Sequence, residues 1–100
     1  MLGCIGVAPP RDATWETGSG AMPVRGDMPA GHVSSGPPSA NGGNVDTKHI
    51  IAGTTVFMPV FEQGAYFAVG DGHAAQGDGE VCGSAIETDM WVQCRVRVWG

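Results

Sequence analysis

Apolar and polar residues alternate most regularly in the last part of the chain, residues 90–99. One set of alternate positions is apolar: Met90, Val92, Cys94, Val96 and Val98. The other set carries polar residues and two tryptophans: Trp91, Gln93, Arg95, Arg97 and Trp99. A period of two is typical of a β-strand, because successive side chains point to opposite faces of a sheet. The sequence therefore predicts a strand over residues 90–99 that turns its apolar face into a core.

Four further apolar runs predict shorter strands, which cover residues 2–8, 54–60, 65–71 and 81–87. In the first of them Leu2, Cys4 and Val7 are the residues that could face the core. Pro9 and Pro10 end that strand, since proline cannot donate a hydrogen bond to a neighbouring strand. The only helix we expect is a single turn at residues 74–76. The predicted fold is therefore mainly β, one domain over residues 1–100 with short strands in a sandwich or barrel-like arrangement.

A long stretch rich in glycine and proline, residues 13–43, separates the first strand from the others. No hydrophobic period survives there, and we interpret it as a glycine-rich loop. It contains the triplet Arg25-Gly26-Asp27, a sequence that can serve cell adhesion. It also contains His32, which we expect to be solvated. Since nothing marks the chain as extracellular, the adhesive hypothesis is not favoured.

The composition narrows the class of protein. Glycine accounts for 17 of the 100 residues, and charged residues are only 15% against the roughly 25% usual in globular proteins. The net charge of −5 and the lack of a basic patch argue against a nucleic-acid partner. Cys4, Cys82 and Cys94 form no Cys-x-x-Cys pair, which favours reduced thiols and a cytoplasmic location. The first residues lack the basic start of a signal peptide, and no apolar run reaches the roughly 18 residues of a membrane span.

Residues 69–81 combine ligand-type side chains with glycine more densely than any other part of the chain. In an extended segment residues i and i+2 point the same way, so Asp71 can share a face with His73, and Asp78 with Glu80. One histidine with carboxylates suits a divalent ion such as Zn²⁺, and Asp71, His73 and Asp78 are the candidate ligands. Glu80 is then a candidate general base. The alternative is that the aspartates only form turns and the histidine is a satisfied polar residue.

Two neighbouring features have simpler interpretations. Residues 41–48 begin with Asn41-Gly42-Gly43, which favours a tight turn, although the same turn can present backbone N–H groups to a ligand. Cys82 directly follows residues 69–81, and we expect a buried structural thiol there rather than a reactive one.

Several segments of the chain resemble the acetamidase/formamidase family. They are Gly42-Gly43-Asn44-Val45-Asp46-Thr47-Lys48, residues 55–61 (Thr-Val-Phe-Met-Pro-Val-Phe) and residues 70–83, which contain Gly-Asp-Gly-His-Ala-Ala-Gln-Gly-Asp-Gly-Glu. The opening residues 2–9 are similar to that family too, in the same order. The resemblance implies a largely β hydrolase that acts on the carbon–nitrogen bond of short linear amides and releases ammonia and a carboxylate. It also favours a divalent metal, with Zn²⁺ first, at the motif of acids and histidine.

The resemblance extends to the roles of individual residues. It implies Asp71 and His73 as metal ligands, and Glu80 as a ligand or a base. Asp46 is the next catalytic candidate. Asn44 is expected to hold the developing oxyanion, together with backbone N–H groups of the Gly-Gly turn.

Members of this family are much longer than 100 residues, and the chain resembles only their C-terminal part. The alternative hypothesis is therefore a non-catalytic β module, or a subunit that needs an N-terminal partner segment or forms a homo-oligomer. The tryptophan-bearing face of residues 91–99 would meet such a partner. A third hypothesis is a module that binds small amides or anions at the Gly-Gly turn.

Overall fold

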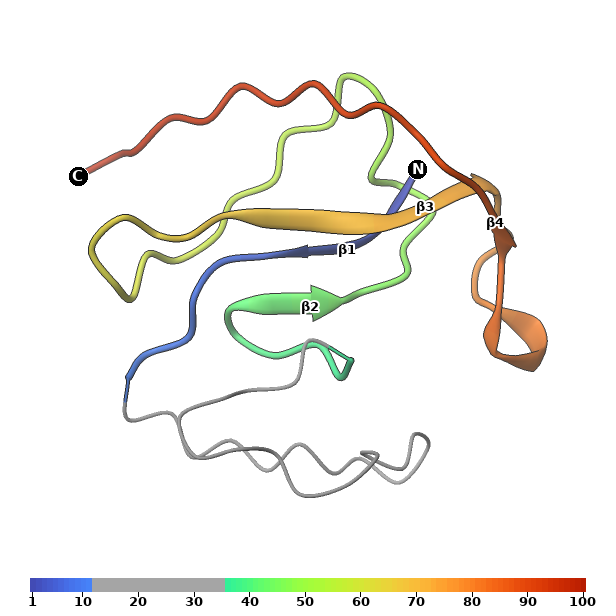
Figure 1. The fold of residues 1–100 in the computed structure, drawn as a ribbon, viewed down its shortest axis with the longest axis horizontal. Coiled ribbons are helices and arrows are strands. Elements are labelled where there is room, and N and C mark those ends of the chain that lie inside the picture. The colour runs from blue at the N-terminus through green and yellow to red at the C-terminus, as the bar shows by residue number, and fades with distance from the viewer. Residues whose placement is uncertain (12–35) are drawn as a thin grey trace.

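The computed structural model describes residues 1–11 and 36–100, and within them the chain is mainly β, as predicted (Figure 1). Its elements are β1 (Leu2–Gly6), β2 (Gly42–Asn44), β3 (Ala68–Ala75), the 3₁₀ turn η1 (Val81–Gly83) and β4 (Ile86–Glu87). The described strands form one antiparallel sheet in the order β2-β1-β3-β4. Most of the loop predicted at residues 13–43, including Arg25-Gly26-Asp27 and His32, lies outside the described residues.

β1 is the strand on which the sheet is built, because it pairs with β2 along one edge and with β3 along the other. Cys4 lies opposite Asn44 of β2 and opposite Gly70 of β3. The pairing with β3 begins one residue before β1, where the backbones of Met1 and His73 exchange hydrogen bonds of 2.8 and 2.9 Å. The buried apolar side chains of the described residues are Leu2, Ile5 and Val7. β1 and the residue after it therefore supply this small core as well as the ladder.

β2 stands where the sequence predicted a tight turn at Gly42 and Gly43. A turn does precede it, in which the backbones of Ser39 and Gly42 exchange hydrogen bonds of 2.8 and 2.9 Å. Gly42 has a φ of 93°, and a Cβ at this position would lie 2.2 Å from the carbonyl oxygen of Ile5. Only glycine fits there without strain, and its bare backbone lets β2 lie against β1.

β3 begins at Ala68, later than the predicted strand over residues 65–71, and continues to Ala75. Ala65 and Tyr66 have φ angles of 53° and 52° and belong to the turn before the strand. Ala75 pairs with Ile86 of β4, so the helical turn predicted at residues 74–76 does not form. As a result, residues 69–81, which carry the candidate ligands, begin inside a strand.

Two other predictions of secondary structure need correction. Residues 54–60 form no strand, and nearly all of them are exposed, because β-branched composition favours a strand without supplying a partner for it. Of residues 81–87, only the last two are in a strand, since η1 occupies the start and Cys82 has a φ of 66°.

Cys82 is exposed and is therefore not a buried structural thiol. Cys4, which was expected in the core, is only half-buried, and Ile5, which was not predicted there, is buried.

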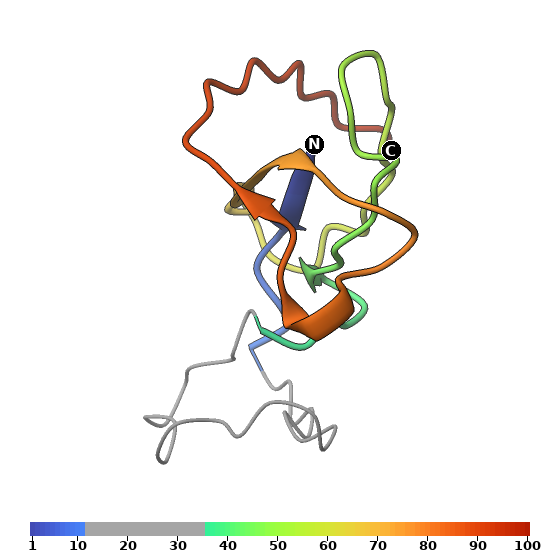
Figure 2. The same ribbon diagram turned by 90° about the vertical axis from the view of Figure 1, so that its right-hand side faces the viewer.

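The most regular alternation in the sequence, at residues 90–99, does not form a strand. This segment runs apart from the sheet in both views (Figure 1 and Figure 2). Just before it, the N–H of Thr88 donates to the carbonyl of Gly72 at 2.8 Å, and at its far end Trp99 meets Phe57 edge to face at 5.4 Å. The face predicted to be buried is exposed, with Val98 at 78%. Alternation determines which side chains share a face but not what covers that face.

In the part of the chain that the structure describes, helical structure is limited to η1, and no helix could cross a membrane.

We expect Gly42→Ala to destabilise the sheet, because the added Cβ would overlap the carbonyl oxygen of Ile5 at an unfavourable φ. The expected loss is about 2–4 kcal/mol in the free energy of unfolding, measured by urea denaturation. Gly70→Ala is the matched control, since Gly70 lies in β3 and nothing lies within 4 Å of a Cβ built there. An equal loss in both variants would contradict the assigned role of Gly42.

Candidate functional site

His73 is the most deeply buried polar residue of the described chain, with a relative exposure of 1%. It lies in β3, where backbone pairing with Met1 fixes its position. Its Nδ1 lies 2.9 Å from Oε1 of Gln76, and the Nε2 of Gln76 donates to the backbone carbonyl of Asp46 at 2.5 Å. The other ring nitrogen, Nε2, is buried and has no hydrogen-bond partner. The polar atoms nearest to it are carboxylate oxygens, which cannot donate a proton to a neutral ring, so this nitrogen is the first candidate for a ligand contact.

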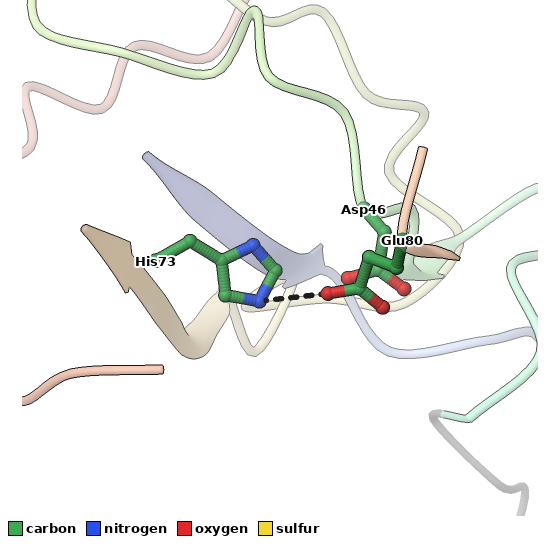
Figure 3. A group of neighbouring side chains, drawn as sticks. All are labelled: Asp46, His73 and Glu80. Carbon is green, nitrogen blue, oxygen red and sulfur yellow. Dashed lines mark ion pairs between the residues drawn. The ribbon is translucent and has the colours of Figure 1, made fainter. Parts of the chain in front are cut away.

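Carboxylates from three parts of the chain surround this nitrogen. Asp71 Oδ1 lies 3.2 Å, Glu80 Oε1 3.3 Å and Glu87 Oε2 3.4 Å from Nε2 of His73. Asp46 adds a further carboxylate, and Figure 3 shows it beside Glu80, facing the edge of the ring. Asp46, His73 and Glu80 offer ligand atoms within 4.8 Å of one another, and so do Asp71, His73 and Glu87. These five residues are called the acid–histidine cluster below.

Asp46 is held in the cluster by its backbone and by a neighbouring amide. The N–H groups of Val45 and Asp46 both donate to the carbonyl of Gly3, at 2.9 and 3.0 Å. Asp46 has a φ of 42°, and its Oδ2 accepts a hydrogen bond from Nδ2 of Asn44. Its Oδ1 is buried and has no hydrogen-bond partner. The cluster therefore contains two buried atoms with unused bonding capacity, Asp46 Oδ1 and His73 Nε2.

The cluster gathers over the bare backbone of Gly3 in β1. A Cβ at this position would lie 2.3 Å from Asp71 Oδ2, 2.6 Å from Asp46 Oδ1 and 2.7 Å from His73 Cε1. Any side chain at Gly3 would therefore occupy the space in which these three groups meet. The absence of a side chain leaves room there for side chains from β3 and from the segment after β2.

The electrostatics of the cluster favour protons or a cation. Burial raises the pKa of Asp46, and the nearby carboxylates of Glu80 and Asp71 raise it further. Burial lowers the pKa of His73, but the hydrogen bond to Gln76 and the charges of Asp71 and Glu87 outweigh this, so the net shift is upward. Burial, Asp71 and Asp46 raise the pKa of the Cys4 thiol. Cys4 is thus kept as a thiol, which makes it a poor nucleophile.

A divalent cation fits this set of donors on two observations. One imidazole nitrogen and several carboxylate oxygens are ligands that Zn²⁺ and similar ions accept. Asp46 Oδ1 and His73 Nε2 are both buried without partners, and both adjoin the cradle over Gly3. A cation held there would satisfy both atoms and balance the acidic charge.

The structure brings together most of the residues that the sequence singled out. Asp46, Asp71, His73 and Glu80 meet in the cluster, and Asn44 contacts it through Asp46. Asp78 is not brought in: its side chain is 93% exposed, and its Oδ1 lies 2.5 Å from Nζ of Lys48.

Glu87 and Gln76 were not predicted as site residues from the sequence, and donors that were predicted for an oxyanion are already engaged. Glu87 reaches His73 from β4, and no spacing in the sequence pointed to it. Gln76 lies within residues 69–81, and its amide was the available signal. The N–H of Gly42 donates to Ser39, and the amide of Asn44 donates to Asp46, so two of the donors expected for an oxyanion already have partners within the chain.

A cleft of about 370 Å³ adjoins the cluster on the side of Asp71. Its other lining residues are Leu2, Val69, Gly70, Gly72, Thr88, Asp89, Met90 and Val92. Its walls combine apolar side chains with the polar side chains of Thr88 and Asp89, and Asp71 belongs to both the cleft and the cluster. A small molecule in this cleft would lie beside the carboxylate that is 3.2 Å from His73.

The family profile and the individual relatives that match this chain point to the same family. The profile of the Acetamidase/Formamidase family matches residues 5–100. An acetamidase of Mycolicibacterium smegmatis is 47% identical over 62 residues, and a formamidase of Methylophilus methylotrophus is 40% identical over 62 residues. Each alignment covers 60% of this chain but only 15% of the relative, so the chain spans about 15% of the length of these relatives. No solved structure matches the chain significantly.

The raised pKa of His73 predicts how stability depends on pH when cations are removed with a chelator. Folding favours the protonated ring, so its stabilising effect is complete below the ordinary value of 6.5 and is lost as the pH rises through the folded pKa. Asp46 acts in the same direction at lower pH, because its pKa is also raised. We therefore expect a higher midpoint of thermal unfolding at pH 6 than at pH 8, followed by circular dichroism.

His73→Gln should abolish most of this difference between pH 6 and pH 8. His49→Gln is the control, because His49 is exposed and lies outside the cluster. A wild-type chain that is more stable at pH 8 than at pH 6 would show that the electrostatics of the cluster have been misjudged.

Proposed function

This chain belongs to the Acetamidase/Formamidase family, and we propose on this basis that it carries the catalytic cluster of an amidohydrolase for short linear amides such as formamide or acetamide. The observation that carries the proposal is the buried Nε2 of His73, which has no hydrogen-bond partner and is faced by carboxylates at 3.2–3.4 Å. Burying these groups together lowers the free energy of unfolding, and a bound ligand that pairs with them would offset this loss.

We propose that a divalent cation, with Zn²⁺ first, is held by His73 and Asp71 together with Glu80 or Asp46. A bound divalent cation lowers the pKa of a water molecule and polarises a carbonyl group. Glu87 lies at the more exposed side of the cluster, where its Oε2 contacts His73 and its Oε1 accepts from the N–H of Ala85 at 3.2 Å. Support for the cation comes from the two buried unpartnered atoms and from the cradle over Gly3.

The residues of the chain can supply the proton transfers that hydrolysis needs. Water oxygen bonds to the amide carbon, the carbon–nitrogen bond breaks, and the nitrogen leaves as ammonia after gaining a proton. Where Glu80 completes the ligand set of the cation, Asp46 is our candidate for the group that takes the proton from water and passes it to nitrogen, because its raised pKa makes it a stronger base. Asn44 orients this carboxylate through its hydrogen bond to Oδ2. The cleft beside Asp71 is the proposed place for the substrate.

A non-catalytic module that needs a partner is the second candidate. The observation on its side is the exposed apolar surface of residues 90–99, with Trp91 fully exposed, in a chain that spans about 15% of its relatives. The partner would be a second copy or a segment equivalent to the rest of the longer relatives.

A reducing, cytoplasmic compartment also remains a proposal, supported by three free cysteines.

Binding of Zn²⁺ tests the ligand set directly. Isothermal titration calorimetry is expected to show binding by the wild-type chain and a loss of more than about 100-fold in affinity for His73→Ala, since even outer-shell changes cost about 10–100-fold. Affinity should rise with pH through the pKa of His73, because the cation competes with a proton for the ring. Asp78→Asn is the matched control and should bind as the wild type does, because Asp78 lies outside the cluster.

An equal loss of affinity in Asp78→Asn would return that residue to the ligand set. If wild-type chain binds none of Zn²⁺, Mn²⁺ and Mg²⁺, the proposed cation site is wrong.

Release of ammonia from formamide and acetamide tests the reaction. With the cation supplied, we expect ammonia from at least one of the two amides, measured by a coupled glutamate dehydrogenase assay. Asp46→Asn should lower kcat by about 10²–10⁴-fold, since it removes the proposed base. Asp78→Asn should leave kcat unchanged. A chain that binds the cation and releases no ammonia from either amide would instead support the non-catalytic module.

A further inference from the structure

We propose that Gln76 is a positioning residue that holds the proton of the neutral His73 ring on Nδ1 and ties that ring to the backbone of Asp46. The inference rests on the proposed function, because it concerns how the ligand nitrogen of the cation site is kept available. Gln76 touches none of the carboxylates in the described contacts, so it would act through its two neighbours.

The direction of the two hydrogen bonds follows from the chemistry of the partners. A backbone carbonyl only accepts hydrogen bonds, so the Gln76 atom 2.5 Å from the carbonyl of Asp46 must be the amide nitrogen. The amide oxygen must then be the atom 2.9 Å from Nδ1 of His73. An amide oxygen also only accepts, which requires a proton on Nδ1. The neutral ring consequently presents the lone pair of Nε2 to the cluster.

The carboxylates of the cluster would otherwise favour the opposite tautomer. Asp71, Glu80 and Glu87 place oxygen atoms 3.2–3.4 Å from Nε2, and each of them would accept a proton carried there. A proton on Nε2 would occupy the position that a cation needs. Gln76 is the described partner of Nδ1, and it offers that nitrogen a competing acceptor on the other side of the ring.

The second hydrogen bond of Gln76 links two parts of the cluster that are distant in sequence. Gln76 follows directly after β3, whereas Asp46 follows β2, 30 residues earlier. Asp46 has a φ of 42°, a conformation that neighbouring contacts must hold in place. By accepting from Gln76, the carbonyl of Asp46 is fixed relative to the same ring that its carboxylate faces. One amide thus sets both the state of the ring and the place of the acid.

Nuclear magnetic resonance of the imidazole nitrogens tests the assignment without any cation or substrate. The spectra are recorded on ¹⁵N-labelled full chain in chelator at alkaline pH, where the ring is neutral, and His73 is assigned by the loss of its signals in His73→Gln. We expect the wild-type ring to show a protonated Nδ1 and a bare Nε2. Gln76→Met, which keeps the length of the side chain but neither hydrogen bond, should move the proton towards Nε2.

Two further variants separate the two roles and control for the substitution. Gln76→Glu keeps an acceptor for Nδ1 but cannot donate to Asp46, so the tautomer should be retained. Gln63→Met changes an exposed glutamine outside the cluster and should leave the spectrum unchanged. With Zn²⁺ alone as the probe, Gln76→Met should bind about 10–100-fold more weakly than the wild type, and Gln63→Met should bind equally well.

A wild-type ring with its proton on Nε2, or an unchanged tautomer in Gln76→Met, would overturn the inference. The result is independent of the proposed function, because absence of Zn²⁺ binding in the wild type would refute the cation site while the nitrogen spectra still decide the role of Gln76.

Discussion

The candidate site depends on a close approach over the backbone of Gly3. β1 lies between β2 and β3, so a side chain at this position would project into the space shared by Asp46, Asp71 and His73. The carbonyl of the same residue accepts from the N–H groups of Val45 and Asp46, which turns Asp46 towards that space. One residue therefore sets the distance between the segment after β2 and β3 by its backbone, and leaves the room between them by its missing side chain. The pairing of β1 on both sides therefore shapes the candidate site.

The cluster is difficult to explain as a source of stability. The described apolar core is small, formed by Leu2, Ile5 and Val7, while a buried histidine and four carboxylates meet beside it. Like charges at such distances repel, and removing them from water adds a further cost. The ion pairs of Arg11 and Lys48 go to Glu62 and Asp78, which lie outside the cluster. Within the described contacts the cluster has only the His73 ring to balance its acids, and a protein tolerates this where a ligand supplies the missing charge.

The sequence allowed prediction of those contacts that depend on local geometry. Asp71 and His73 are two residues apart in an extended segment, so their meeting follows from the strand itself. Asp46 was reached only through the family resemblance, because its position depends on how β2 pairs with β1. Glu87 depends on the irregular register between β3 and β4, where His73 lies opposite Glu87 and the ladder then shifts. No pattern along one segment contains the register between two, which is why this ligand candidate could not be foreseen.

Residues 90–99 also show that the pattern of one segment cannot predict which strand it pairs with, and two of these residues line the cleft beside the site. Their alternation predicts a strand, but a strand also needs a neighbour, and the described chain supplies none for residues 90–99. Met90 and Val92 of this segment form one wall of the cleft beside Asp71, and Met90 lies so close to Gly72 that a Cβ there would be 2.9 Å from its Cγ. The acid–histidine cluster is held by backbone pairing within the sheet, whereas this wall of the cleft belongs to a segment without a paired strand. Capacity to bind a cation and capacity to bind an amide thus rest on different parts of the fold, and only the second depends on what covers the exposed face of residues 90–99.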